Sequence, residues 1–263
     1  MDLQLTNKVA LVTGSTAGIG NAIAASLARE GASVIVSGRL AVDVDAAVAS
    51  MKAETRGDVL GFAGDLSFAA VAESLVQRYP VVDILVNNLG IFEVKPFEEI
   101  TDADWQRFFD VNVLSGARLA RLYLPSMRRR NWGRIIFISS ESAYHIPSEM
   151  IHYGMTKAAQ IAVARGLAET TAGTGITVNS VLPGPTRSRG VGDFVAAMAQ
   201  RTGQSAEQVE REFFKTARPT SLLQRFATPA EVAAMVAYVA SPLSAATNGA
   251  ALRVDGGTIK SAF

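Results

Sequence analysis

Short apolar runs alternate with longer stretches of helical spacing along the whole chain. Residues 8–13, Lys-Val-Ala-Leu-Val-Thr, form an apolar run rich in β-branched side chains, which predicts a buried parallel strand. Long helices are expected near 102–130 and 151–172. The alternation predicts a single α/β domain over residues 1–263, a doubly wound Rossmann-like parallel sheet of about seven strands with helices on both faces. The other strands are expected at 33–37, 58–62, 82–86, 134–138, 176–181 and 250–254.

A glycine-rich turn follows the first expected strand. Gly14, Gly18 and Gly20 have the spacing G-x-x-x-G-x-G, and a helix is expected over 21–30, closed by Gly31. Glycines let backbone N–H groups approach a pyrophosphate, and the N-terminus of a helix supplies positive potential. The turn therefore predicts a dinucleotide site. Its expected cofactor-binding residues are Gly14, Ser15, Thr16, Gly18, Ile19 and Gly20.

An arginine follows the second expected strand. Arg39 lies where dinucleotide folds carry either an acid for the ribose hydroxyls of NAD or an arginine for the 2′-phosphate of NADP. The arginine favours NADP(H). Ala17 gives the turn no second basic group, so NAD(H) stays open.

Polar residues and glycines recur just after the other strands. The carboxyl ends of parallel strands meet at one edge of a sheet, where ligands bind. Each of these residues is also an ordinary turn former, but their common location favours a site. Asp65 is suitably placed for an adenine amine. The expected cofactor contacts of this group are Asp65, Leu66, Asn88, Gly90, Pro183, Gly184, Thr186 and Ser188.

The chemistry is expected from Tyr153 and Lys157. Side chains four residues apart on a helix share a face, with Cβ atoms about 6 Å apart. A phenol has a reference pKa of about 10, and a neighbouring ammonium lowers it. Tyr153 beside Lys157 is thus predicted to pass a proton to or from a substrate hydroxyl, with the Ser140 hydroxyl holding the substrate oxygen. The pair alone is common on ordinary helices, and the other motifs favour the catalytic interpretation.

Composition excludes several other classes of protein. The 25 Lys and Arg residues balance 24 Asp and Glu residues, so no basic bias indicates nucleic acid. The absence of cysteine excludes thiol catalysis and disulfides, and the two histidines are too few to predict a metal site. No apolar run approaches the roughly 18 residues of a membrane span, and the N-terminus lacks signal-peptide features. A cytoplasmic protein is expected.

Together, these motifs resemble the short-chain dehydrogenase/reductase family over essentially the full length. The resemblance implies that Tyr153 is the general acid/base and that Lys157 lowers its pKa and holds the nicotinamide ribose. Ser140 would position the substrate oxygen, and Asn112 would anchor a water that links Lys157 to solvent. Thr186 and Ser188 would meet the carboxamide and phosphates. The segments that carry the resemblance are 13–20, 65–66, 87–90, 110–113, 140, 153–157, 183–184 and 254–257.

The resemblance implies an oxidoreductase that transfers a hydride between NADP(H) and a carbonyl or secondary alcohol. The substrate stays open among 3-oxoacyl compounds, sugars, steroids and simple ketones. The alternatives are an NAD(H)-dependent dehydrogenase of a sugar or polyol, a nicotinamide-dependent isomerase or epimerase, and a non-catalytic dinucleotide-binding sensor or scaffold. Leu89 departs from the family's usual alanine, and its bulk either crowds the cofactor or points into the core.

The substrate cleft of the family forms between the segment 140–153 and the segment after strand six. Ser142, Glu149 and His152 are candidate substrate contacts. Glu149 and His152 would give the cleft a fairly polar wall, unless they point to solvent or to a neighbouring subunit. Residues 185–226 are expected to form a lid. Members of the family usually pair their two long middle helices across subunits. A homo-oligomer, dimer or tetramer, is therefore expected. The apolar stripe that suits either this interface or the core is Ile161, Ala164, Leu167 and Ala168.

Overall fold

The expected strands form one parallel sheet in the computed structural model, which describes residues 2–55 and 58–262. The seven strands have the order β3-β2-β1-β4-β5-β6-β7. Each lies within two residues of its expected position, because buried parallel strands read as continuous apolar runs. The strands are β1 (Val9–Val12), β2 (Ser33–Gly38), β3 (Val59–Ala63), β4 (Ile84–Asn87), β5 (Gly133–Ile138), β6 (Ile176–Pro183) and β7 (Ala251–Val254).

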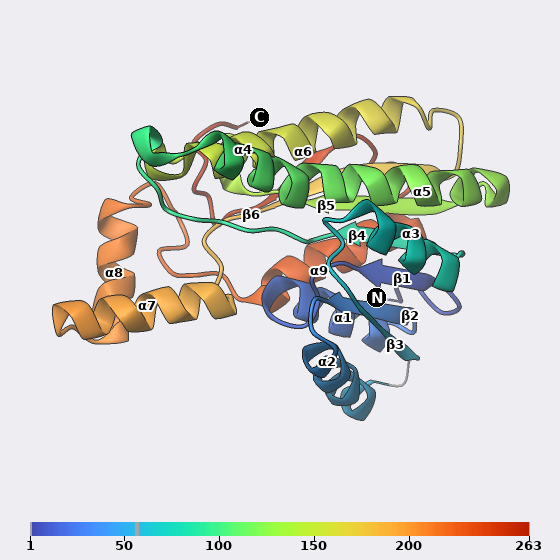
Figure 1. The fold of residues 1–263 in the computed structure, drawn as a ribbon, viewed down its shortest axis with the longest axis horizontal. Helices are drawn as coiled ribbons and strands as arrows, with labels where there is room; N and C mark the ends of the chain where they lie inside the picture. The colour runs from blue at the N-terminus through green and yellow to red at the C-terminus, as the bar shows by residue number, and fades with distance from the viewer. Residues whose placement is uncertain (1, 56–57, 263) are drawn as a thin grey trace.

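Helices cover both faces of the sheet (Figure 1). Alternate residues of a strand point to opposite faces, so Ala10 and Val12 enter one core and Leu11 enters the other. The first core packs β1 against α1 and α9, and the second packs it against α3, α5 and α6. The helices are α1 (Gly18–Arg29), α2 (Ala41–Glu54), α3 (Ala69–Arg78), α4 (Asp102–Phe109), α5 (Ser115–Arg130), α6 (Ile151–Glu169), α7 (Arg189–Thr202), α8 (Ala206–Thr216) and α9 (Pro229–Ala240).

Two helix boundaries differ from the expected ones. The first helix begins at Gly18 rather than at residue 21, so the second half of the glycine turn already belongs to it. The long helix expected near 102–130 is interrupted by one π-helical turn, Asp110–Leu114, between α4 and α5. Asn112 lies in this turn. Single π turns inside α-helices occur frequently at functional sites.

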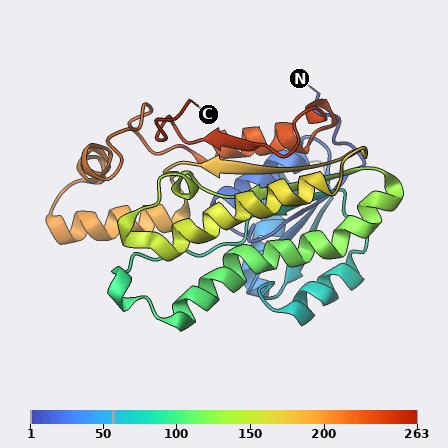
Figure 2. The ribbon, with the colours of Figure 1, turned by 90° about the horizontal axis from the view of Figure 1, so that it is seen from above.

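The strand order places the site. β1 pairs with β2 on one side and with β4 on the other, with Leu11 opposite both Ile35 and Leu85. β2 and β3 therefore lie on one side of β1 and the later strands on the other. Ligands of such folds bind at the point where the strand order reverses. Figure 2 shows the arrowheads of the last two strands pointing toward α7 and α8, which lie beyond that edge of the sheet.

Among the described residues, no helix has the length and apolarity required to cross a bilayer.

Candidate active site

The three glycines of the turn are required by its backbone conformation or its packing. Gly14 and Gly18 have φ of +61° and +58°, the left-handed region that favours glycine. A Cβ on Gly20 would lie 2.4 Å from both the Gly14 carbonyl oxygen and the Asn88 amide nitrogen. That amide donates to the carbonyls of Thr13 and Gly14 at 2.9 and 3.0 Å. The end of β4 thus fixes the turn, and the tight backbone at the start of α1 fits a pyrophosphate.

Replacing Gly20 with alanine should weaken cofactor binding and stability together. The new Cβ meets a backbone oxygen that cannot move without opening the turn, and such overpacking costs roughly 1–3 kcal/mol. We expect a lower free energy of unfolding and a higher Kd for NADPH, measured by denaturant titration and by fluorescence. Gly192→Ala is the matched control, because a Cβ at this helical glycine meets nothing within 4 Å. Gly20→Ala with unchanged NADPH affinity would contradict this assignment of the turn.

The other residues expected at the adenosine end divide into two kinds. Arg39 is exposed directly after β2 and forms no salt bridge with any residue that the structure describes, and Thr16 lies against Gly38 beside it. Ser15 and Leu66 are buried, so their side chains are not available to a cofactor. The Ser15 hydroxyl instead donates to the Val12 carbonyl and accepts from the Ser37 N–H, tying β1 to β2. The predicted cofactor contact of Ser15 therefore does not involve a free hydroxyl, and it stays a prediction.

Asp65 is partly buried after β3, and its Oδ1 accepts from both the N–H and the hydroxyl of Ser67 at 3.0 and 2.6 Å. Leu89 packs against the core beneath α3 and α5 and does not line the cavity described next. Its Cδ1 also lies 3.7 Å from the position of a Cβ on Gly14, so its bulk is in contact with the core and close to the glycine turn.

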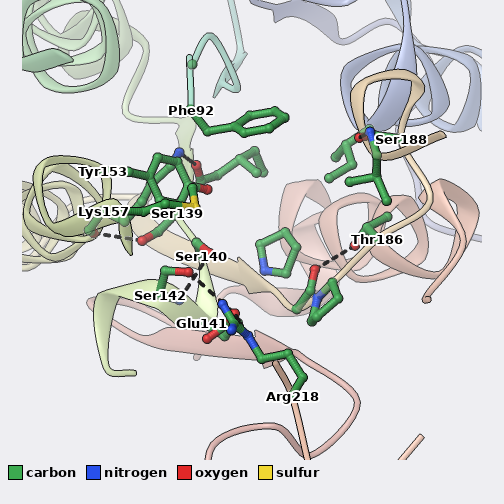
Figure 3. Close-up of a pocket in the computed structure, with 18 of the residues that line it drawn as sticks. Phe92, Ser139, Ser140, Glu141, Ser142, Tyr153, Lys157, Thr186, Ser188 and Arg218 are labelled. Atoms are coloured by element: carbon green, nitrogen blue, oxygen red, sulfur yellow. Dashed lines mark hydrogen bonds and ion pairs between the residues drawn. The ribbon is translucent and has the colours of Figure 1, made fainter. Parts of the chain in front are cut away.

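A cavity of about 520 Å³ opens at the carboxyl edge of the sheet, within the usual size of small-molecule sites (Figure 3). It runs from Ile19 at the start of α1 to the residues that follow β6. Tyr153 and Lys157 lie on one wall with the serines after β5, and Thr186 and Ser188 lie across from them. The expected site residues that line it are Ile19, Asn88, Gly90, Ser140, Ser142, Glu149, Tyr153, Lys157, Pro183, Gly184, Thr186 and Ser188.

The wall of this cavity is mostly apolar, which corrects the expectation of a polar one. Ile91, Phe92 and Val94 after β4 face Phe213 and Phe226 from the segment after β6. Phe92 contacts the Tyr153 ring edge-on, with centroids 6.4 Å apart. The segment 91–94 was not anticipated from the sequence, because it lies in a loop without periodicity.

His152 does not belong to this wall. It is fully buried on the other side of α6, where its ring packs 3.9 Å from that of Phe108 and 6.1 Å from that of Trp105. Neighbouring residues of a helix face different directions, so placing Tyr153 on the cavity turns His152 away from it. The prediction that His152 contacts substrate was wrong.

Burial dominates the acidity of the central pair. It raises the pKa of Tyr153 to about 12, against a lowering by a hydrogen bond with Ser140, and it lowers the pKa of Lys157 to about 7. The lysine Nζ lies 5.5 Å from the centre of the Tyr153 ring. In this structure burial outweighs the neighbouring groups that lower the Tyr153 pKa, since it disfavours the phenolate, and the effect of Lys157 stays a prediction. With its pKa raised to about 12, the Tyr153 phenol is protonated at neutral pH.

Lys157 and Asn112 are held by buried hydrogen bonds. The Lys157 Nζ donates to the Ile138 carbonyl at 2.9 Å and to the Gln160 side chain at 3.2 Å. Asn112 does not line the cavity, and its side chain binds the backbone of Ile91 in both directions. Its amide also donates to the Thr156 hydroxyl at 3.0 Å. Asn112 thus fixes the loop after β4 against α6.

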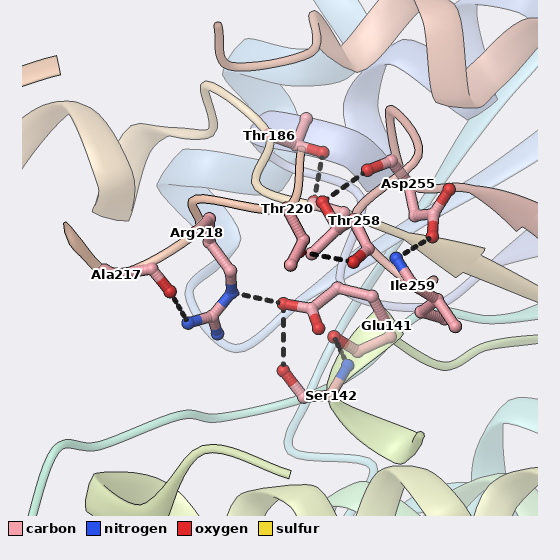
Figure 4. Close-up of polar contacts among 11 residues, drawn as sticks. Glu141, Ser142, Thr186, Ala217, Arg218, Thr220, Asp255, Thr258 and Ile259 are labelled. Carbon is pink, nitrogen blue, oxygen red and sulfur yellow. Dashed lines mark hydrogen bonds and ion pairs between the residues drawn. The ribbon is translucent and has the colours of Figure 1, made fainter. Parts of the chain in front are cut away.

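A buried ion pair joins Glu141, in the segment after β5, to Arg218, in the segment after α8 (Figure 4). The Arg218 Nε donates to the Glu141 carboxylate at 2.9 Å, and their side chains are 11% and 4% exposed. Glu141 directly follows Ser140, whose hydroxyl accepts from the Ser142 N–H. Burial raises the pKa of Glu141, and Arg218 opposes that rise. The sequence analysis did not single out Glu141, although its place beside Ser140 was a usable signal.

Residues 8–199 match the family described as short chain dehydrogenase. The chain is 47% identical to the uncharacterized oxidoreductase YvaG of Bacillus subtilis, with 100% of each chain covered. It is 35% identical to the D-beta-hydroxybutyrate dehydrogenase of Cupriavidus necator, covering 97% of this chain and 99% of the other. A structure of L-sorbose reductase from Gluconobacter frateurii, complexed with NADPH and L-sorbose, superposes with a TM-score of 0.93 at 31% identity, covering 99% and 100%.

The sheet order and the glycine turn at the start of α1 agree with the fold that the sequence resemblance implies, and the family match extends over residues 8–199. The chain therefore belongs to the short-chain dehydrogenase family of NAD(P)-dependent oxidoreductases.

Proposed function

We propose that the protein reduces a ketone to a secondary alcohol with NADPH. The observation that carries this proposal is the common location of Ser140, Tyr153 and Lys157 on the wall of a cavity that begins at the glycine turn. The cofactor supplies the hydride. The chain supplies the position of the substrate and the proton for its oxygen.

Each residue of the site has a role in this proposal. The Ser140 hydroxyl binds the substrate oxygen and orients the carbonyl. Tyr153 donates its phenolic proton to that oxygen as negative charge develops there. Lys157 provides a hydrogen-bond donor for the nicotinamide ribose and, in its protonated form, positive charge next to the tyrosine. Asn112 keeps the loop after β4 in contact with α6, and therefore maintains one wall of the cavity.

Burial raises the pKa of Tyr153 and so favours the protonated phenol, the form that acts as the acid in ketone reduction. A neutral phenol donates a proton, whereas alcohol oxidation needs the phenolate. At neutral pH the protein holds the form that reduction needs.

Arg39 supports NADPH over NADH. It is a cation at the end of β2 that pairs with none of the residues the structure describes, and it lies where the 2′-phosphate of NADP is expected. The similar L-sorbose reductase was solved with NADPH. Loss of a hydrogen bond to a charged group costs about 1.5–3 kcal/mol, or roughly 10- to 100-fold in affinity. Arg39→Ser should raise the Kd of NADPH by that factor and leave the Kd of NADH nearly unchanged. Wild-type protein that binds NADH more tightly would overturn the choice of cofactor.

The apolar wall selects among the candidate substrates. It fits a ketone carried on an aliphatic chain, with few polar groups beyond the reacting oxygen. The likeness to L-sorbose reductase favours a second candidate, a ketone of a sugar or polyol. Titration with NADPH and NADH, followed by a panel of aliphatic 3-oxo compounds and ketoses, decides between them. NADPH binding without turnover across both groups would instead favour a dinucleotide-binding sensor.

We also propose that residues 185–226 form a lid and that subunits pair through α5 and α6. The lid residues include α7 and α8, which lie beyond the sheet edge and contribute Val191 and Phe213 to the cavity. A surface groove lies between α5 and α6, lined by Leu124 and Leu167 among others. Ala164 and Ala168 of the expected stripe instead enter the core.

A further inference from the structure

The amide of Gln160 is one of the buried polar groups of α6. It is 1% exposed, and it lies three residues after Lys157 on the same side of the helix. Burying an amide costs free energy unless its donor and acceptor are both satisfied. Both are satisfied here, by the Lys157 amine and by the backbone carbonyl of Asn112.

The orientation of this amide is set by its neighbours. The Oε1 accepts from the Lys157 Nζ at 3.2 Å, and the Nε2 donates to the Asn112 backbone carbonyl at 2.5 Å. An ammonium can only donate and a carbonyl can only accept, so a flipped amide would lose both bonds. The Gln160 side chain therefore forms a direct bridge from the π-helical turn to the lysine.

This bridge occupies the place that the sequence analysis assigned to a water on Asn112. With the Ile138 carbonyl, Gln160 takes up two of the three N–H groups of Lys157. The third remains for the cavity, since Lys157 lines it. The bridge thus restricts where the ammonium points.

We propose that Gln160 is a positioning residue that replaces a bridging water between Asn112 and Lys157 and aims the lysine at Tyr153 and the cofactor ribose. It touches neither substrate nor cofactor and acts through Lys157. The inference rests on the roles proposed for Tyr153 and Lys157.

Two substitutions separate positioning from simple packing. Gln160→Met fills a similar space but removes the acceptor for Lys157 and the donor for Asn112. Gln160→Ala removes four side-chain atoms and leaves room for a water of about 30 Å³ with polar partners on two sides. If the amide stands in for water, the alanine variant regains the bridge through solvent and the methionine variant does not.

We expect Gln160→Met to lower kcat about tenfold and to weaken NADPH binding, the loss that accompanies one hydrogen bond to a charged group. Gln160→Ala should lie closer to the wild type in both properties, although its Tm should be the lower of the two because of the cavity. A packing role predicts the opposite order of activity. Wild-type kcat and NADPH affinity in Gln160→Met, or a slower Gln160→Ala than Gln160→Met, would overturn the inference.

A third variant and a binding measurement cover the cases in which the alanine variant does not fold or no ketone is reduced. Gln160→Ser repeats the comparison with a small side chain should the alanine variant not fold. NADPH affinity is measured on each variant without substrate, so the inference can be judged even if no ketone of the panel is reduced. Turnover by the wild type together with unaffected Gln160→Met would reject the role of Gln160 alone and leave the proposed function standing.

Discussion

Tyr153→Phe should abolish ketone reduction while leaving NADPH binding nearly intact. The substitution removes only the phenolic hydroxyl, and general acid catalysis contributes typically about 10²–10⁴-fold to a rate. The ring keeps its edge-on contact with Phe92, so the shape of the cavity persists. We expect kcat to fall by that factor, measured as NADPH oxidation with the best ketone of the panel.

Tyr144→Phe is the matched control for this prediction. Tyr144 lies in the same connection between β5 and α6, but it is exposed and does not line the cavity. The same chemical change there should leave kcat unchanged. Retention of most activity in Tyr153→Phe would reject the acid role of this residue. Loss of NADPH binding in the variant would show that the hydroxyl acts on the cofactor instead.

Arg218→Met should produce the largest loss of stability among these substitutions. It leaves the Glu141 carboxylate buried without its cation, and breaking a buried pair in this way costs about 3–5 kcal/mol. Because Glu141 follows Ser140, we also expect a higher KM for the ketone. Denaturant titration measures the first effect and initial rates measure the second.

The loss of stability in Arg218→Met should increase as pH rises. Burial raises the pKa of Glu141, and removing Arg218 takes away a contact that lowers it. A carboxyl whose pKa is higher in the folded state binds more protons there than in the unfolded state, so stability falls as pH rises. The deficit of Arg218→Met should therefore be larger at about pH 8 than at about pH 5.

Two controls test the cause of this loss. The double variant Glu141→Gln, Arg218→Met removes both charges of this pair and should recover much of the stability. Arg29→Met breaks a pair with Glu54 whose side chains are 54% and 55% exposed, and such surface pairs contribute about 0–1 kcal/mol. A deficit in Arg218→Met no greater than that in Arg29→Met would refute the structural importance of the buried pair.

Local patterns were sufficient for the fold and for part of the site. Buried parallel strands appear as apolar runs, and the glycine turn appears between the first strand and its helix, so both were predictable. Tyr153 and Lys157 were predictable as a pair because four residues make one helical turn. The parallel direction of the strands predicted that the polar residues after them lie together at one edge of the sheet.

The side to which a residue faces was harder to predict. The sequence placed Tyr153 and His152 side by side, and only the packing of α6 against Phe108 decided that one faces the cavity and the other the core. Similarly, only the placement of β2 beside β1 showed that the Ser15 hydroxyl bonds to the backbone of both strands.

The sequence by itself determined the order of strands and helices along the chain, the glycine turn and the Tyr153–Lys157 pair, because each is encoded within one strand or one helical turn. The tertiary structure alone decided the Glu141–Arg218 pair, whose members are 77 residues apart, and the bridge from Gln160 to Asn112, which are 48 apart. It also decided the acidity of Tyr153, since desolvation depends on every element that surrounds the phenol. Contacts between distant segments and the water that they exclude are properties of the folded chain.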